Sequence, residues 1–180
     1  FSKGLLKWVL SFAVMYVGFR VVLPVFFSLG YIPSASMEPT LNTGDWTFCI
    51  NLRWALLDRG DIIVFNPNKE EGSEQLFVKR LIGLPGDRVR IEHDKVFVNG
   101  EELDEPYKGS TLDYTGSFVV PKHKYFLLGD NRGDSLDARF WEDPFVSEEQ
   151  LKYEVKARIL PLGDLKLYNG HKYKEKSSMY

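Results

Sequence analysis

The sequence predicts a mainly β protein, mainly antiparallel, that is preceded by one membrane-spanning helix. Three observations lead to this fold class. The 180 residues are 44% hydrophobic and 14% aromatic, enough for one well-cored domain. After residue 30, short apolar or alternating runs are separated by turn residues, the pattern of strands. Before residue 30, the chain is almost continuously apolar.

The N-terminal segment Trp8–Leu29 has 22 residues, of which only Arg20 is charged. About 20 apolar residues span a bilayer core. Lys3 and Lys7 precede the segment, and the positive-inside rule therefore puts the N-terminus in the cytoplasm and the rest of the chain outside. A cleavable signal peptide and a buried core helix are the alternatives. Arg20 weakens the spanning interpretation, and the long apolar stretch beyond it weakens the signal-peptide one.

Seven strand segments follow the apolar segment. Asn99-Gly100 is a strong tight-turn dipeptide, so we expect a hairpin over 89–103. Ser147 could cap a short helix over 147–153, with Gln150 at the capping-box position. The polar residues 169–180 are expected to fray. The strand segments are WTFCINL, DIIVF, LFVKRLIGL, RVRIEHDKVFVNG, SFVV, KYFLLGD and VKARILPL.

Composition excludes some function classes. The formal net charge of -2 gives no basic field for nucleic acid, and we expect no nucleic-acid partner. The single Cys49 is expected to be a small apolar strand residue, and no Cys/His cluster has metal-site spacing. We therefore expect neither a metal nor another cofactor.

A peptide-bond hydrolase needs a nucleophile, a base and donors to the oxyanion. His93, His123 and His171 stand in charged or terminal surroundings, so a Ser-His-Asp triad is poorly supported. A lysine can be the base if burial lowers its pKa. Lys79 follows apolar residues and would share a face of its strand with them, although Arg80 could equally take the inward position.

Two polar clusters could supply the other groups. The prolines Pro33 and Pro39 stiffen a loop that carries Ser34 and Ser36, although a polar linker leaving a membrane would look the same. The segment 129–139, GDNRGDSLDAR, has the density of charge and amide groups expected of a hydrogen-bonded buttress. A solvated or calcium-binding acidic loop is the alternative.

Taken in order, four motifs resemble those of the bacterial type I signal (leader) peptidases, which are Ser-Lys serine proteases. They are PSASMEPTL at 33–41, RGDIIVF at 59–65, KRLIGLPGD at 79–87 and GDNRGDSLDAR at 129–139. The resemblance runs from about residue 1 to 162. It implies two antiparallel sheets, with the domains 1–29 (anchor), 30–165 (catalytic) and 166–180 (polar tail).

The resemblance also implies roles for individual residues. Ser36 would be the nucleophile, Lys79 its general base, and Ser34 an oxyanion donor beside the backbone N–H of Ser36. Ser135 would hydrogen-bond the Lys79 ammonium. Asp130, Asp137 and Arg139 would hold the loop behind it. Shallow apolar pockets for small substrate side chains would be lined by Ile32, Met37, Leu41, Val64, Phe77 and Val78.

Some positions depart from the family pattern. Gly133-Asp134 replaces the usual Asp-Asn, Ala138 a frequent Ser and Glu142 a usual Gly, and Ala35 stands where Gly is common. None of these is a dyad or oxyanion residue.

The function implied is a membrane-bound endopeptidase that removes signal peptides from exported preproteins through an acyl-enzyme. Its partners would be preprotein signal peptides, the lipid bilayer and the secretion machinery. It would lie in the plasma (inner) membrane as a single-pass protein with the catalytic domain on the outer or periplasmic side. The alternatives are a specialised processing peptidase for pilin or conjugation precursors, an organelle inner-membrane version, and a catalytically silent peptide-binding β domain. A self-cleaving repressor with a related dyad is disfavoured, because a membrane segment stands where its DNA-binding module would be.

Overall fold

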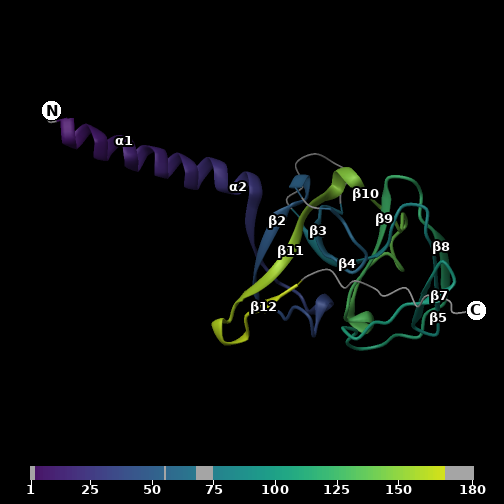
Figure 1. The fold of residues 1–180 in the computed structure, drawn as a ribbon. Coiled ribbons are helices and arrows are strands. Elements are labelled where there is room, and N and C mark those ends of the chain that lie inside the picture. Colours follow the sequence, from purple (N-terminus) through teal and green to yellow (C-terminus); the bar gives the residue numbers. More distant parts are fainter. Residues whose placement is uncertain (1–2, 55, 68–74, 169–180) are drawn as a thin grey trace, which may run out of the picture.

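A single apolar helix projects from a β body in the computed structural model, which describes residues 3–54, 56–67 and 75–168 (Figure 1). The helix consists of α1 (Lys3–Val17), a π-helical turn η1 (Gly18–Val22) and α2 (Leu23–Phe26). Its part Gly4–Phe26 is long and apolar enough to cross a membrane, with a mean hydropathy of 2.0. None of that stretch is buried against the β body, so packing within the chain does not explain its apolar surface.

The larger of two antiparallel sheets carries most of the chain. Its strand order is β1-β2-β11-β3-β4-β9-β10, and β12 pairs with β11. The long strand β11 pairs with β2 on one side and β3 on the other, which joins both halves of the sheet. The strands are β1 (Phe27–Tyr31), β2 (Trp46–Asn51), β3 (Ile62–Phe65), β4 (Phe77–Gly83), β9 (Lys124–Leu128), β10 (Val146–Ser147), β11 (Leu151–Leu160) and β12 (Lys166–Leu167).

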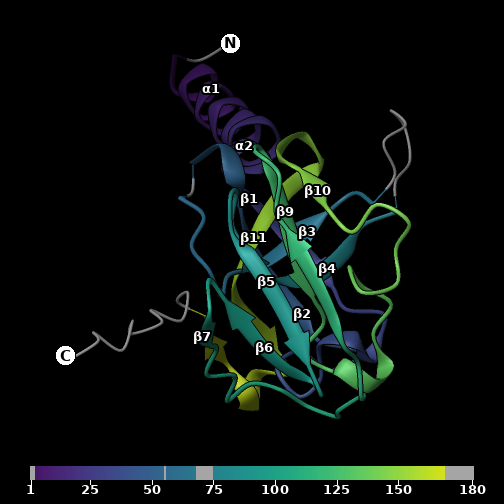
Figure 2. The same cartoon turned by 90° about the vertical axis from the view of Figure 1, so that its right-hand side faces the viewer.

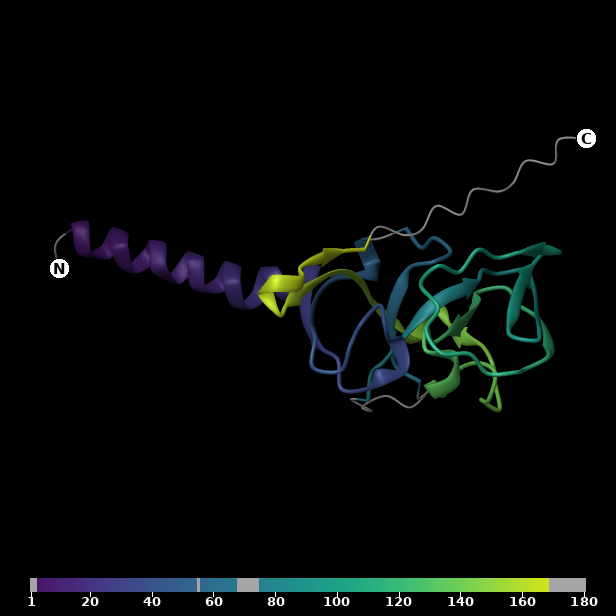
Figure 3. The same cartoon turned by 90° about the horizontal axis from the view of Figure 1, so that it is seen from below.

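The smaller sheet lies at the end of the body opposite the helix (Figures 2 and 3). Its order is β7-β6-β5-β8, formed by β5 (Arg88–Glu92), β6 (Lys95–Val98), β7 (Glu101–Glu102) and β8 (Gly116–Val119). Two-residue turns with positive φ join three of these strands. The turn His93-Asp94 joins β5 to β6, and the turn Asn99-Gly100 joins β6 to β7. The Asn99-Gly100 turn confirms the turn predicted within the hairpin 89–103. The additional turn at His93-Asp94 makes residues 88–102 a three-stranded meander instead of a single hairpin.

The apolar core is divided between three clusters. One joins the small sheet to β4 and β9, and includes Ile82, Val89 and Phe126. The other two lie on opposite faces of the large sheet, where the neighbours Ile62 and Ile63 of β3 point to different clusters. The strands β3 and β4 are therefore interior strands that are covered on both faces, which explains their nearly continuous apolar sequence.

Two predicted helical boundaries are wrong. Phe27–Leu29 belong to β1 rather than the spanning helix, because they pair in register with β2. The helix predicted over 147–153 is only one 3-10 turn, η5 (Glu148–Gln150), although its predicted capping box is present. Leu151 begins β11 instead, because pairing with two neighbouring strands outweighs a short helix.

The C-terminal segment is described as far as Tyr168. Lys166 and Leu167 pair with β11, and the Tyr168 hydroxyl donates a 2.6 Å hydrogen bond to the carbonyl of Thr40. The remaining residues of the expected polar tail, 169–180, lie outside the described residues.

Candidate active site

Ser36 lies in a tight loop between β1 and β2. It is the middle residue of a 3-10 turn, η2 (Ala35–Met37), and is half-buried. Met37 and Leu41 on either side of the following turn are 1% and 0% exposed, and the Leu41 amide donates to the Met37 carbonyl at 2.9 Å. These two apolar anchors fix the loop to the body, so that the Ser36 hydroxyl has a set position.

Lys79 in β4 reaches the Ser36 hydroxyl directly. Its Nζ lies 2.8 Å from Ser36 Oγ, within hydrogen-bond distance. Lys79 is only 5% exposed, and burial lowers its pKa from 10.5 to about 8, opposed by the negative charges of Asp137 and Asp130. A neutral amine is thus accessible close to neutral pH, and it can accept the Ser36 proton.

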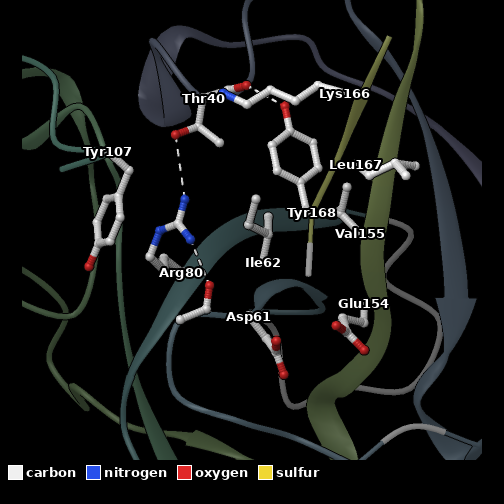
Figure 4. A pocket seen from close by; sticks show the side chains of 11 residues that line it. Thr40, Asp61, Ile62, Arg80, Tyr107, Glu154, Val155, Lys166, Leu167 and Tyr168 are labelled. Carbon is white, nitrogen blue, oxygen red and sulfur yellow. Dashed lines mark hydrogen bonds between the residues drawn. The ribbon is translucent and has the colours of Figure 1, made fainter. Parts of the chain in front are cut away.

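Arg80, the neighbour of Lys79, is also buried, because β4 is covered on both faces. Its guanidinium donates to Asp130 through Nε at 2.7 Å and Nη2 at 2.6 Å. It also donates to the Gly60 carbonyl at 2.6 Å and lies 3.8 Å from the centroid of the Tyr107 ring (Figure 4). The side chains of Lys79 and Arg80 are therefore both buried. Of the two, only Arg80 has an ion-pair partner among the described residues.

Ser34 extends toward the same space as Ser36. Its exposed hydroxyl lies 3.5 Å from Ser36 Oγ, at the limit of a hydrogen bond. A group bonded to Ser36 Oγ would therefore lie within reach of Ser34.

The segment 129–139 is a hydrogen-bonded buttress with most of its residues buried. The alternative prediction for this segment, a solvated or calcium-binding acidic loop, is wrong. Asp130 and Asp137 are both 0% exposed. Asp137 accepts hydrogen bonds from the Arg139 guanidinium at 2.8 and 2.9 Å and from the Gly129 amide at 2.9 Å. Asp130 accepts from Arg80 and from Thr40 at 2.5 Å. Arginine and amide donors occupy the carboxylates that a cation would need.

Ser135 is close to the site but does not make the expected bond. It is 8% exposed, and its hydroxyl has no hydrogen-bond partner among the described residues, so the hydrogen bond to Lys79 is absent. Gly129 leaves room for the Ser135 hydroxyl close to the loop 33–41 that carries Ser36, which we call the serine loop. A Cβ at Gly129 would lie 2.1 Å from Ser135 Oγ and 2.6 Å from the Ser36 carbonyl oxygen, so only glycine fits between them.

The six residues expected to line the substrate pockets fall into two groups. Ile32, Met37, Leu41, Val64 and Val78 pack together in one cluster, and Phe77 packs in another with Phe65. Four of the six, Ile32, Met37, Leu41 and Val64, are buried and form core. Only Phe77 and Val78 are half-buried, and they directly precede Lys79 in β4. These two are the side chains of the set that a substrate could contact most readily.

A separate pocket of about 190 Å³ lies beside Arg80, and neither Ser36 nor Lys79 lines it (Figure 4). Its wall includes two carboxyl groups, Asp61 and Glu154, which are 4% and 1% exposed. Burial raises the pKa of Glu154 from 4.5 to about 7, against the opposing effect of Lys156.

Asn131 and Arg132 belong to the predicted buttress, but the sequence indicated no partner for either. Asn131 donates to the backbone carbonyls of Ala35 and Ser36. The buried Arg132 pairs with Glu105, which lies far from it in the sequence. These contacts join segments about 30 to 100 residues apart, and no local pattern in the sequence could reveal them.

Comparison with known proteins identifies relatives of the chain. The family model described as "Signal peptidase, peptidase S26" matches residues 5–160. The chain is 38% identical over 162 residues to a probable signal peptidase I-2 of Synechocystis sp., covering 87% of this chain and 72% of the relative. It is 36% identical over 189 residues to signal peptidase IB of Staphylococcus aureus, covering 93% and 95%. A crystal structure of a signal peptidase I from Enterococcus faecalis is 33% identical and covers 54% of this chain and 94% of that one, with a TM-score of 0.43.

Proposed function

The chain belongs to the signal peptidase family, peptidase S26, and we propose that its Ser36 and Lys79 form the catalytic dyad. The protein is a serine endopeptidase that removes signal peptides from preproteins. The 2.8 Å distance between Lys79 Nζ and Ser36 Oγ carries the proposal for the dyad. The half-buried position of Ser36 also leaves its hydroxyl open to a substrate.

The proposed reaction begins with proton transfer from the Ser36 hydroxyl to neutral Lys79 as Oγ attacks the scissile carbonyl carbon. The carbonyl oxygen becomes an oxyanion, stabilised by the Ser36 N–H and the Ser34 hydroxyl. Lys79 then returns its proton to the leaving amine nitrogen as the C–N bond breaks. In the second half, Lys79 deprotonates a water that attacks the acyl-enzyme, releasing the signal peptide and restoring Ser36.

The half-buried Phe77 and Val78 support a substrate site beside the dyad. Apolar side chains there would accept small substrate residues next to the scissile bond. Phe77 would also exclude water from Lys79, whose Nζ lies 5.7 Å from the Phe77 ring centroid. Phe77 would thus serve both substrate selection and activation of the base.

The lipid bilayer is the second proposed partner. The protein is membrane-anchored, as its apolar N-terminal helix and its family together indicate. We propose a single-pass topology with the N-terminus in the cytoplasm and the catalytic domain outside, supported by Lys3 and Lys7 before the helix. Protease added to intact spheroplasts should digest the β body, and its protection would contradict this orientation.

Site-directed variants test the dyad. Ser36→Ala and Lys79→Met should both abolish cleavage of a preprotein, with the circular dichroism spectrum unchanged. Ser117→Ala and Lys166→Met, at exposed positions, are the matched controls and should cleave at the wild-type rate. Near wild-type cleavage by the Ser36 or Lys79 variant would contradict the assignment of that residue.

The histidines provide a second control. His93 and His123 are exposed, with side chains 80% and 83% accessible. Replacing either with Ala should leave cleavage unchanged, because the proposed base is a lysine. Loss of cleavage in a folded histidine variant would indicate a different base.

A further inference from the structure

Asn131 contacts both peptide groups that flank the nucleophile. Its side-chain Nδ2 donates to the Ala35 carbonyl at 3.0 Å, and its backbone N–H donates to the Ser36 carbonyl at 3.1 Å. The Ala35 carbonyl also accepts the Glu38 amide at 3.0 Å, which closes the 3-10 turn. Two donors from different segments thus hold the Ala35 carbonyl in place.

The Ala35 carbonyl and the Ser36 N–H belong to one planar peptide group. In a trans peptide the C=O and the N–H point in opposite directions within the plane, so fixing one fixes the other. We propose that Asn131 is a positioning residue that aims the Ser36 N–H at the substrate oxyanion. This inference rests on the proposed role of Ser36 as nucleophile.

Ser110 determines which way the Asn131 amide points. Its hydroxyl oxygen accepts the Gly133 N–H at 3.1 Å, and its own hydrogen is donated to Asn131 Oδ1. Because Ser110 donates to the oxygen end of the amide, the Nδ2 end faces the Ala35 carbonyl. The relay therefore runs from Ser110 through Asn131 to the peptide group of the nucleophile.

Gly133 makes room for this relay. A Cβ at position 133 would lie 2.6 Å from Ser110 Oγ and 3.1 Å from the Thr111 carbonyl oxygen. Such a contact would force the Ser110 hydroxyl to move. Gly133, which departs from the usual family motif, thus leaves the space that the Ser110 hydroxyl needs.

The segment 104–111 that carries Ser110 is packed against the serine loop. The Gly109 amide donates to the Asp130 carbonyl at 2.9 Å, and a Cβ at Gly109 would lie 2.5 Å from the Glu38 carbonyl oxygen. This segment connects β7 and β8 of the smaller sheet. The smaller sheet is thereby linked to the alignment of the oxyanion site, although it carries no dyad residue.

The test compares Asn131→Ala and Ser110→Ala in the full-length protein with a signal-peptide substrate at pH 9. Asn131→Ala should lower kcat about tenfold or more, with KM within about twofold of wild type, because the lost interaction acts mainly in the transition state. Ser110→Ala should lower kcat in the same direction by a smaller factor. A loss that appears only in KM would overturn the inference.

The affinity for a peptide aldehyde distinguishes a positioning role of Asn131 from a purely structural one. Ser36 Oγ adds to its carbonyl carbon, the hydroxyl proton passes to Lys79, and the former carbonyl oxygen occupies the oxyanion site. Its affinity should fall by the same factor as kcat in both variants. The affinity of an uncleaved substrate peptide, measured in the Ser36→Ala background, should stay unchanged.

Controls separate this inference from the proposed dyad. Asn42→Ala and Ser117→Ala, at exposed positions, should retain both kcat and aldehyde affinity. Activity in Ser36→Ala would contradict the dyad itself. An inactive Ser36→Ala together with wild-type kcat and aldehyde affinity in Asn131→Ala would overturn only the role of Asn131. If thermal unfolding shows that Asn131→Ala does not fold, Ser110→Ala decides, and wild-type behaviour of that variant overturns the relay.

Discussion

At the scale of single residues, burial gives two neighbouring cations different properties. Arg80 is held by Asp130 and stays charged, whereas Lys79 has no ion-pair partner among the described residues and its pKa falls to about 8. Desolvation disfavours the charged amine, and the more distant carboxylates offset this only in part. The arginine thus has a structural role beside the buttress, and the lysine has access to the neutral form that the proposed general base needs.

The pKa of Lys79 predicts the pH dependence of catalysis. The neutral amine is the active form, so kcat/KM should rise with pH and level off above an apparent pKa of about 8. An initial-rate profile from pH 6 to 10 measures this directly. A plateau already reached at pH 6 would contradict the role of Lys79 as base, and Lys166→Met should leave the profile unchanged.

The candidate site was predictable from the sequence only through its motifs. Alternation along 76–84 could not decide between Lys79 and Arg80, because an interior strand buries both. The motif order selected Ser36 and Lys79, which lie 2.8 Å apart, yet it also implied a hydrogen bond from Ser135 that is absent. Side-chain rotamers depend on packing that is established only in the folded chain.

At the scale of elements, the strand β4 is stabilised by a buried ion pair at its side. Asp130→Ala would remove the carboxylate partner of the Arg80 guanidinium and leave a buried charge poorly compensated. We expect a loss of about 3–5 kcal/mol in the free energy of unfolding. Urea denaturation followed by tryptophan fluorescence measures this.

An exposed ion pair of the smaller sheet provides the comparison. Glu102 pairs with Lys95 at 3.1 Å, and both side chains are more than half accessible. Because water screens such pairs, Glu102→Ala should cost less than about 1 kcal/mol. Equal losses for Asp130→Ala and Glu102→Ala would contradict the importance of burial.

The strands β3 and β11 bring a second titratable pair together. Glu154 of β11 lies beside Asp61, which directly precedes β3 (Figure 4). The pKa of Glu154 is about 7 in the folded chain against 4.5 ordinarily, so the folded state holds this proton more tightly than the unfolded state. Its contribution to stability is complete below about pH 4.5 and is lost as the pH rises to about 7.

The Glu154→Gln variant tests this linkage. The neutral amide should raise the free energy of unfolding at pH 8–9 relative to wild type, and the gain should shrink toward pH 5. Urea denaturation at several pH values provides the measurement, with Glu101→Gln at an exposed position as the control. A pH-independent difference between Glu154→Gln and wild type would contradict the shifted pKa.

The strands were largely predictable from the sequence, and the errors share a physical cause. The seven apolar or alternating runs all contain strands, because strands with one buried face alternate, as β5 does, and strands covered on both faces, such as β3, are continuously apolar. The two wrong boundaries, at Phe27–Leu29 and Leu151–Tyr153, lie where pairing with β2 or β3 extends a strand. Local propensity cannot account for partners that are distant in the sequence.

At the scale of the whole molecule, the chain separates an apolar helix from a β body. None of the described residues of the helix Gly4–Phe26 is buried, and its main contacts with the body are those of α2 with β1 and β2, so the two parts should be largely independent thermodynamically. Deletion of residues 1–26 should leave the free energy of unfolding of the β body, measured by urea denaturation, within about 1 kcal/mol of wild type, since little packing is lost. A large loss of stability would show that the helix is part of the fold.

The same deletion tests anchoring in the membrane. The full-length chain should float with phospholipid vesicles through a sucrose gradient, and the truncated chain should lose most of this association. A helix this apolar supplies much of the free energy of membrane insertion. Vesicle association that is independent of residues 1–26 would contradict the anchor.

Covalent labelling tests whether Ser36 is a nucleophile that Lys79 activates. An acylating inhibitor of the β-lactam type, added at pH 8–9 where about half or more of Lys79 is neutral, should leave one adduct per chain. Mass spectrometry of peptides should locate the adduct at Ser36, and Ser36→Ala and Lys79→Met should not be labelled. No adduct on the wild-type chain, or an adduct that persists in Ser36→Ala, would contradict the proposed role of Ser36.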